Sequence, residues 1–364
     1  MVVCPEEASK PALALVGDIV VPNASFCTEA TYDPATKLGS RAQSHSALHR
    51  TDRSMFVITE VPPGPPDSIE NLGAKFKFWY HAVDHGLTLF KEGRPGTGEN
   101  WAEKVACELA ECIRLPHALY ELARYNEKQG VVCRTLVARG ARLIHANELL
   151  STSVQDYELR SKSNYRESQH TLRRVLGYFK LSESLQLTAP YGYERTPEIS
   201  SATDFFIGYL MFDAWIGNQD RHDNNWGVIR SNDGSVFLAP SYDHGSSLAR
   251  NESDEIRRLM LTTKDRGRHI SSYIARARSA LYPHHKLDEK VKALFTLEAF
   301  IGAAEKNQLA AEEWCKRLIG VAQLDIVRIL DQVPPAIMSE VAKEFTLKFL
   351  LLNQVRIYSA VFKK

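Results

Sequence analysis

Long apolar runs are missing from this chain of 364 residues. The strongly apolar stretch from Phe349 to Leu352 is far too short to span a bilayer, which takes about 20 residues, so we expect no membrane insertion. The N-terminal sequence MVVCPEEASK lacks the basic start and apolar core of a secretory signal. The six cysteines include no Cys-x-x-Cys pair. We therefore expect reduced thiols in a cytoplasmic protein, without a disulfide framework or a zinc site.

An excess of one charge is also missing, because 45 Lys and Arg side chains face 44 Asp and Glu side chains, for a net charge of +1. A protein held on nucleic acid by neutralising many phosphates needs a basic surplus, so no direct binding to nucleic acid is expected. Hydrophobic residues make up 44% of the chain and charged residues 24%, which is ordinary for a soluble enzyme. The length allows two domains or one domain of two lobes.

Proline density and hydrophobic period divide the chain into three parts. Residues 1–66 form an N-terminal extension of unknown role that ends in the proline-rich linker VPPGPP, since proline this dense breaks helices and central strands. Residues 67–150 alternate polar and apolar side chains as strands do, around one amphipathic helix. The expected strands cover Lys75–Tyr80, Leu87–Lys91 and Val131–Val137. Asn100 is expected to cap the helix, which ends before Pro116.

From residue 151 to residue 364 the helical period dominates. An apolar helix over Thr203–Ile216 leads into a polar loop, and Asn232-Asp233-Gly234 is a strong turn signal for a hairpin between Trp226–Ile229 and Ser235–Leu238. From Asp254 onward the chain is almost wholly helical. Together the parts predict an α+β fold with a small strand-rich N-lobe, a larger mostly helical C-lobe and a cleft between them.

The most informative residues flank the predicted hairpin. Asp220 and Asn225 are five residues apart, the spacing with which protein kinases place a catalytic aspartate and a metal-binding asparagine. Asp243-His244-Gly245 follows the hairpin and matches an Asp-Phe-Gly metal motif with histidine in the middle. The hairpin returns the chain, so the two segments should meet and offer Mg²⁺ hard oxygen ligands beside ATP phosphates.

Candidate phosphate-binding residues precede the loop. Lys91 ends the strand Leu-Thr-Leu-Phe-Lys, and a kinase needs such a lysine on the phosphates with a helix glutamate to orient it. Glu103 is the preferred glutamate, and Glu108 is the alternative. Backbone N–H groups near Gly73 are one candidate for the loop that cradles the phosphates, together with two lysines that open the first strand, Lys75 and Lys77. The glycine-rich stretch of residues 93–98 is the competing candidate.

Three residues beside the catalytic motifs are expected to support them. Arg221 and His222 should hold the loop, with His222 bonding the backbone and fixing Asp220. His244 should lie near the metal without being one of its ligands.

The loop GNQDRHDNNWG, residues 217–227, and the segment LAPSYD, residues 238–243, resemble the HipA-like kinase family. That family similarly carries an Asn-x-Asp-x-His-x-x-Asn loop and a Leu-x-Pro-x-Tyr-Asp motif. The strand lysine, the helix ending Glu-Leu-Ala110 and the Leu-Pro116 after it are similar as well, and the loop is distantly like that of phosphatidylinositol 3/4-kinases. The likeness runs over roughly residues 70–360, whereas residues 1–60 do not match.

This resemblance implies a bilobal protein-kinase-like fold, ATP and Mg²⁺ as cofactors, and phosphorylation of serine or threonine on a protein substrate. Asp220 would be the base, Asn225 and Asp243 would hold the metal, and Lys91 would contact phosphate. A regulatory protein partner is also compatible with it. Three alternatives stay open: a lipid or small-molecule kinase, a nucleotide-binding module without turnover, and a metal-dependent phosphohydrolase with ligands Asp220, His222, Asp243 and His244.

Overall fold

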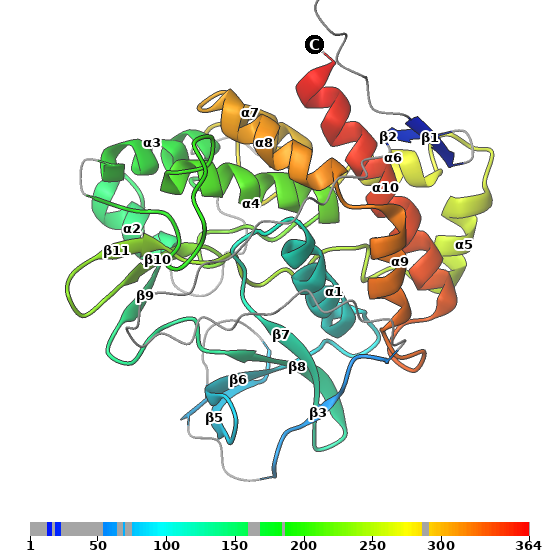
Figure 1. Ribbon diagram of the computed structural model, residues 1–364, viewed down its shortest axis with the longest axis horizontal. Helices are drawn as coiled ribbons and strands as arrows, with labels where there is room; N and C mark the ends of the chain where they lie inside the picture. Colours follow the sequence, from blue (N-terminus) through cyan, green and yellow to red (C-terminus); the bar gives the residue numbers. More distant parts are fainter. Residues whose placement is uncertain are drawn as a thin grey trace, which may run out of the picture.

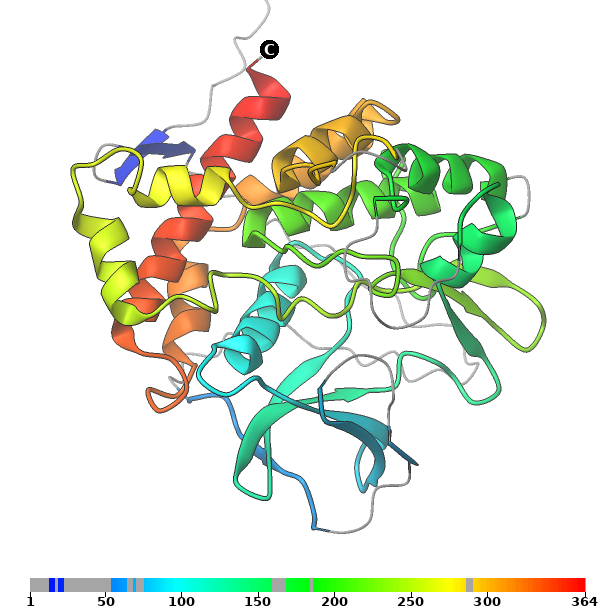
Figure 2. The same ribbon diagram turned by 180° about the vertical axis from the view of Figure 1, so that it is seen from behind.

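The computed structural model describes residues 13–16, 19–22, 54–63, 68–69, 75–158, 168–183, 186–285 and 291–363. Within these ranges a strand-rich part stands at one end of the molecule and the helices at the other, with α1 (Glu99–Cys112) between them (Figure 1). The view from behind shows the same separation (Figure 2). The expected α+β fold with two unequal lobes is confirmed.

The strand-rich part is a six-stranded sheet in the order β3-β7-β8-β6-β5-β4. The pairs β5–β6, β6–β8 and β7–β8 are antiparallel, and the edge strand β3 runs parallel to β7. A small core of Val61, Phe78, Phe90, Ala123 and Val132 packs on it. The strands are β3 (Thr59–Glu60), β4 (Ser68–Ile69), β5 (Lys77–Ala82), β6 (Gly86–Glu92), β7 (Tyr120–Tyr125) and β8 (Lys128–Arg134).

A second sheet carries the predicted hairpin. Its strands lie in the order β11-β10-β9, with β9 (Arg142–His145), β10 (Gly227–Arg230) and β11 (Val236–Leu238) all antiparallel. The turn between β10 and β11 contains Gly234 at φ 87°, a left-handed conformation that glycine adopts without strain. The hairpin expected from Asn-Asp-Gly is therefore confirmed, and it gains a third strand from residues before α2.

Helices make up the rest of the described chain. The buried helix α4 forms the centre of the main hydrophobic core, and every residue from Asp204 to Ile216 is buried. A helix that is apolar all round must be covered on all sides, and α3, α7, α8 and α10 pack around it. Their bounds are α2 (Ala146–Ser153), α3 (Leu172–Glu183), α4 (Ala202–Ile216), α5 (Asp254–Thr262), α6 (Ile270–Ala275), α7 (Thr296–Ala304), α8 (Gln308–Ile319), α9 (Gln323–Asp331) and α10 (Glu340–Phe362).

One expected cap is wrong. Helix α1 begins at Glu99 with Gly98 as its N-cap residue, so Asn100 lies inside the first turn. The Asn100 side chain instead donates to Gln129 Oε1 at 3.2 Å, and this contact ties the helix to β8. Two further expectations lie outside the described residues in whole or in part: Gly73, and most of the extension over residues 1–66. Within that extension the structure describes two short strands, β1 (Leu13–Val16) and β2 (Ile19–Pro22), which pair antiparallel.

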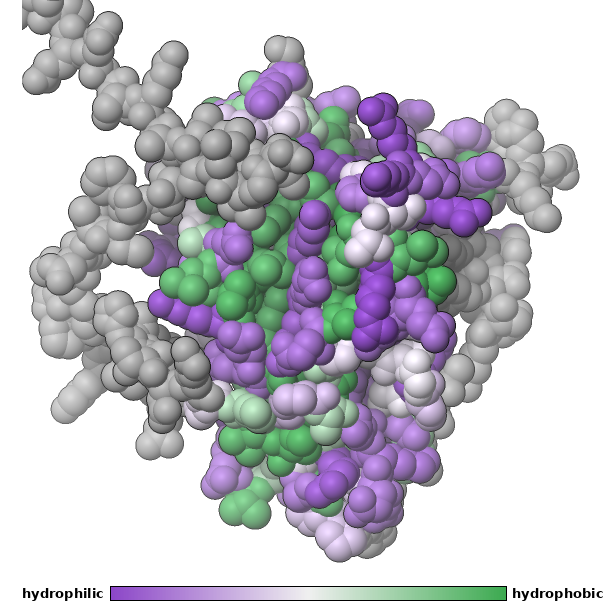
Figure 3. Space-filling view, turned by 90° about the vertical axis from the view of Figure 1, so that its right-hand side faces the viewer, coloured by the Kyte–Doolittle hydropathy of each residue, from purple (hydrophilic) through white to green (hydrophobic). Residues whose placement is uncertain are grey.

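Large apolar side chains reach the surface at scattered places. Ile256 and Leu259 on α5 and Leu324 on α9 are examples, and Figure 3 shows one face on which hydrophobic side chains gather between hydrophilic ones. Among the helices in the described ranges, none combines the length and the apolarity needed to cross a membrane.

Candidate active site

Lys91 lies at the centre of a buried ionic cluster. Strand β6 places it opposite Lys77 of β5, so both side chains project from the same face of the sheet. Lys91 Nζ is 3.1 Å from Glu103 Oε2 and also forms an ion pair with Asp243. Glu108 instead contacts Lys104, at 2.6 Å. The structure thus brings together Lys91, Glu103 and Asp243, and it selects Glu103 over Glu108 as the partner of the lysine.

The electrostatics of the cluster keep Lys91 and Asp243 charged. Burial would lower the pKa of Lys91, but Asp243 and Glu103 outweigh it and raise the pKa above its usual value. Burial would likewise raise the pKa of the Asp243 carboxyl, but nearby lysines hold it well below its usual range. Lys91 contributes most to this effect, followed by Lys75 and Lys77. Burial, and after it the charge of Lys91, lowers the pKa of Lys75 to about 7. Three lysines around one carboxylate form a setting suited to a polyanion such as a metal-bound phosphate.

The Asp-His-Gly segment packs against the start of α1. Asp243 has φ 58°, a left-handed conformation that aspartate tolerates better than most residues. The next N–H group, that of His244, donates to Glu103 Oε1 at 2.6 Å. Glu103 therefore uses one oxygen on Lys91 and the other on the backbone beside Asp243. A Cβ atom on Gly245 would lie 2.7 Å from Glu103 Oε2 and 3.1 Å from Glu99 Cγ, so this close approach needs glycine.

We expect Gly245→Ala to weaken the binding of MgATP. The added methyl group must displace the Glu103 carboxylate, which is held by Lys91, and overpacking of this kind costs about 1–3 kcal/mol. If all of this cost reduces the binding free energy, the dissociation constant measured by calorimetry should rise about 5- to 150-fold. Gly177→Ala in α3 is the matched control because its Cβ atom meets nothing within 4 Å. Equal affinities in the two variants would contradict the expectation.

The loop predicted to be catalytic begins where α4 ends. Gly217 caps that helix with φ 63°, and a Cβ atom there would lie 2.6 Å from Phe349 Cζ. Within the loop, Asn225 Nδ2 donates to the backbone oxygen of Asp220 at 2.8 Å, and Asn225 N–H donates to His222 O at 2.9 Å. Because its amide nitrogen is used in this way, Asn225 keeps Oδ1 as the oxygen it can offer to a metal ion.

Arg221 holds the loop to the core. Its fully buried guanidinium binds Asp213 of α4 through two contacts of 2.8 Å, and Nη1 donates to Asn225 O at 2.9 Å. Nη2 also donates to Ser241 Oγ at 2.8 Å. One side chain thus links α4, the catalytic loop and the segment that precedes Asp243. Such a bidentate pair fixes geometry as well as charge.

Two histidines belong to this arrangement, His222 in the loop and His244 beside Asp243. His222 Nδ1 accepts from Asn224 N–H at 3.1 Å, and His222 Nε2 is 3.7 Å from Asp220 Oδ1. His244 is buried against Phe212, and its Nε2 lies 2.7 Å from Ser241 Oγ. Burial lowers the pKa of His244 well below its usual value, so the ring is neutral. Through the contact of Nε2 with Ser241, His244 belongs to the hydrogen-bond network that supports the loop.

Four residues of the site escaped the sequence analysis: Glu99, Asp213, Ser246 and Arg250. Glu99 lies one helical turn before Glu103 and forms an ion pair with Lys75, and this four-residue spacing was a usable signal. Asp213 is an acid inside an otherwise apolar helix, which also marks it, because buried acids need partners. No pattern around Ser246 or Arg250 indicates that they approach Asp220.

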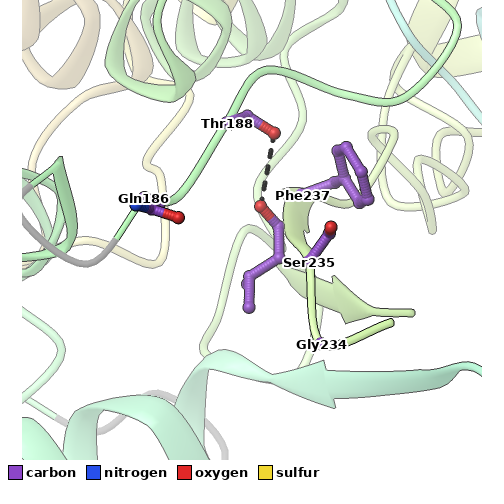
Figure 4. Close-up of a pocket in the computed structure, with 6 residues that line it drawn as sticks. Gln186, Thr188, Gly234, Ser235 and Phe237 are labelled. Atoms are coloured by element: carbon purple, nitrogen blue, oxygen red, sulfur yellow. Dashed lines mark hydrogen bonds between the residues drawn. The ribbon is translucent and has the colours of Figure 1, made fainter. Parts of the chain in front are cut away.

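Outside this cluster, the described residues contain only weaker candidates for a functional site. Within the described ranges there is no group of three or more His, Cys, Asp or Glu side chains placed to hold a metal ion by themselves. A hollow of about 170 Å³ lies beside β11 (Figure 4). Thr188 lines it and donates its hydroxyl to Val236 O at 3.3 Å. None of the candidate site residues lines this hollow.

A solved structure shares this architecture. The crystal structure of the proinflammatory kinase CtkA from Helicobacter pylori matches with a TM-score of 0.60 and 23% sequence identity, over 81% of this chain and 95% of that one. The chain has the fold of this kinase.

The other comparisons, of sequence and of structure, give weaker matches. The serine/threonine-protein kinase CtkA of Helicobacter pylori strain J99 is 24% identical over 166 residues, which cover 45% of this chain and 45% of that protein. The HipA toxin of Shewanella oneidensis MR-1, in complex with HipB and operator DNA, aligns with a TM-score of 0.46 and 13% identity, over 83% of this chain and 67% of that one. No protein-family model matches the sequence.

Proposed function

We propose that this chain transfers the γ-phosphoryl group of ATP to a serine or threonine hydroxyl of a protein. The observation that carries the proposal is the buried contact of Lys91 with both Glu103 and Asp243. A kinase uses such a lysine to hold phosphates, with a helix glutamate and a metal-binding aspartate beside it. The likeness to CtkA supports a kinase, and because CtkA is a serine/threonine-protein kinase it also supports a serine or threonine acceptor.

Asp220 is the proposed base. It starts the loop whose return segment contains Asp243, and the two segments are joined where Gln219 N–H donates to Ser246 O at 3.2 Å. In this proposal the acceptor hydroxyl gives its proton to the Asp220 carboxylate as its oxygen bonds to phosphorus and ADP leaves. Lys91, with Lys75 and Lys77 near it, holds the phosphate oxygens. Positioning and charge supply most of the rate in such transfers.

Magnesium fits the donors present. The Asp243 carboxylate stays ionised, and Asn225 directs its amide nitrogen to Asp220 O. One carboxylate oxygen and one amide oxygen, completed by phosphate oxygens and water, form the oxygen-rich coordination that Mg²⁺ prefers. A bound Mg²⁺ would supply charge neutralisation at the phosphates.

The direct test uses γ-labelled MgATP with dephosphorylated casein as a generic acceptor. We expect label in casein, and none after chelation of divalent cations with EDTA. Label in added phospholipid or small alcohols instead of protein would favour the lipid or small-molecule alternative. Phosphate release from p-nitrophenyl phosphate without ATP would favour a phosphohydrolase. Binding of MgATP without any transfer would leave only the nucleotide-binding module.

A further inference from the structure

A hydroxyl of this chain already contacts the proposed base. Ser246 Oγ lies 3.3 Å from Asp220 Oδ2, and the backbone oxygen of Ser246 accepts from Gln219 N–H at 3.2 Å. Ser246 therefore meets the catalytic loop through both its side chain and its backbone. It lies three residues after Asp243, on the segment that the Asp-His-Gly turn directs back toward the loop.

Arg250 determines which way this hydroxyl points. Its Nη2 is 3.2 Å from Ser246 Oγ. A guanidinium can only donate, so Ser246 Oγ accepts there and keeps its own proton for the Asp220 carboxylate. The backbone oxygen of Arg250 accepts from Gly98 N–H at 2.8 Å, and this bond fixes the residue against the start of α1.

The contact continues to the phosphate side of the site. Arg250 Nη1 lies 3.4 Å from Glu99 Oε2, and the same carboxylate accepts from Arg94 N–H at 3.1 Å. Glu99 is 3% exposed and also pairs with Lys75, one of the three lysines near Asp243. A continuous line of contacts thus joins a lysine of the strand-rich lobe to the base in the helical lobe.

We propose that Ser246 and Arg250 are positioning residues that orient the Asp220 carboxylate for transfer. With Oδ2 held by Ser246 and Oδ1 lying 3.7 Å from His222 Nε2, the carboxylate has a fixed orientation toward the acceptor hydroxyl. Because Arg250 is tied through Glu99 to Lys75, the base takes this orientation when the phosphate-binding strands are in place. The inference rests on the proposed function, since it assigns Asp220 the role of base.

The test compares four single variants with wild type, using MgATP and dephosphorylated casein. We expect Ser246→Ala to lower kcat roughly 10- to 100-fold, the range for a misplaced catalytic group, with the KM for MgATP nearly unchanged. Ser246→Thr keeps the hydroxyl and should restore most of the rate. Ser246→Cys has a similar volume with a weak donor, and it should fall between them. Ser247→Ala is the matched control, because this neighbouring buried hydroxyl has no hydrogen-bond partner among the described residues.

The outcomes separate the two proposals. Absence of transfer by wild type would refute the proposed function itself. Transfer by wild type with equal kcat in Ser246→Ala and Ser247→Ala would overturn the positioning role. The same holds if Ser246→Thr is as slow as Ser246→Ala, or if mass spectrometry finds phosphate on Ser246, because the hydroxyl would then be an acceptor. If Ser246→Ala does not fold, a wild-type kcat in Ser246→Cys would overturn the inference equally well.

Discussion

Asp220→Asn should lower kcat about 10²- to 10⁴-fold, the range that general-base catalysis contributes. The amide has almost the same shape as the carboxylate, so the contacts of the loop backbone with Asn225 and Gln219 should persist. What is lost is the ability to take the proton of the acceptor hydroxyl. The residues proposed to bind phosphate are untouched, so the affinity for MgATP should change by less than a few-fold. Single-turnover transfer from labelled ATP and calorimetric titration of MgATP measure the two quantities.

The matched control is Asp223→Asn in the same loop. The Asp223 carboxylate accepts a hydrogen bond from Tyr157 Oη at 2.6 Å. It is therefore bound to a side chain of this protein and is not the proposed base for the acceptor hydroxyl. Its replacement should leave kcat within a few-fold of wild type. Equal transfer by Asp220→Asn and wild type would remove Asp220 from the mechanism. An equal loss in both variants would show that any change of charge in the loop is damaging.

Arg221→Met should lower the free energy of unfolding by about 3–5 kcal/mol, the cost of leaving one half of a buried ion pair uncompensated. The guanidinium has no exposed surface. Methionine would remove the donor that binds the Asp213 carboxylate and two further acceptors, Asn225 O and Ser241 Oγ. A loss of this size is a large fraction of the stability of a typical domain. Urea denaturation followed by circular dichroism measures it.

Two further variants make this prediction specific. Arg328→Met removes an arginine whose side chain is 64% exposed, and it should change the stability by less than about 0.5 kcal/mol. Arg221→Met combined with Asp213→Leu removes both charges of the buried pair and should recover part of the loss. A double variant no more stable than Arg221→Met would argue against the ion pair as the source of the effect.

The sequence was sufficient where a local pattern determines the structure. The alternation in Leu87–Lys91, the apolar run before Gly217 and the Asn-Asp-Gly turn each specify one element, and all three elements form. The strand β7 was missed because Tyr120–Tyr125 breaks the alternation at Leu122-Ala123 and contains no β-branched residue. The helix start was misplaced because Glu99 and Asn100 are both plausible first-turn residues. In the structure the helix begins at Glu99, whose side chain contacts side chains that are distant in the sequence.

The site was predictable only in part, for a related reason. Lys91 and Asp243 are 152 residues apart, and only their resemblance to a known order of motifs suggested that they meet. The roles assigned to Asp220, Asn225 and Asp243 stay predictions until the variants are measured. Ser246 and Arg250 carry no motif of their own. Their importance depends on where the chain turns after Asp243, which is decided by packing against Glu103.

The contact between Gly217 and Phe349 has a consequence for synthesis. Phe349 belongs to α10, and Asn353 of the same helix donates to Trp215 O at 2.9 Å. The end of α4 and the start of the catalytic loop therefore rest on a helix made long after them. During translation the loop is made before this support exists, so we expect it to reach its final position only after α10 has been made and has packed against α4.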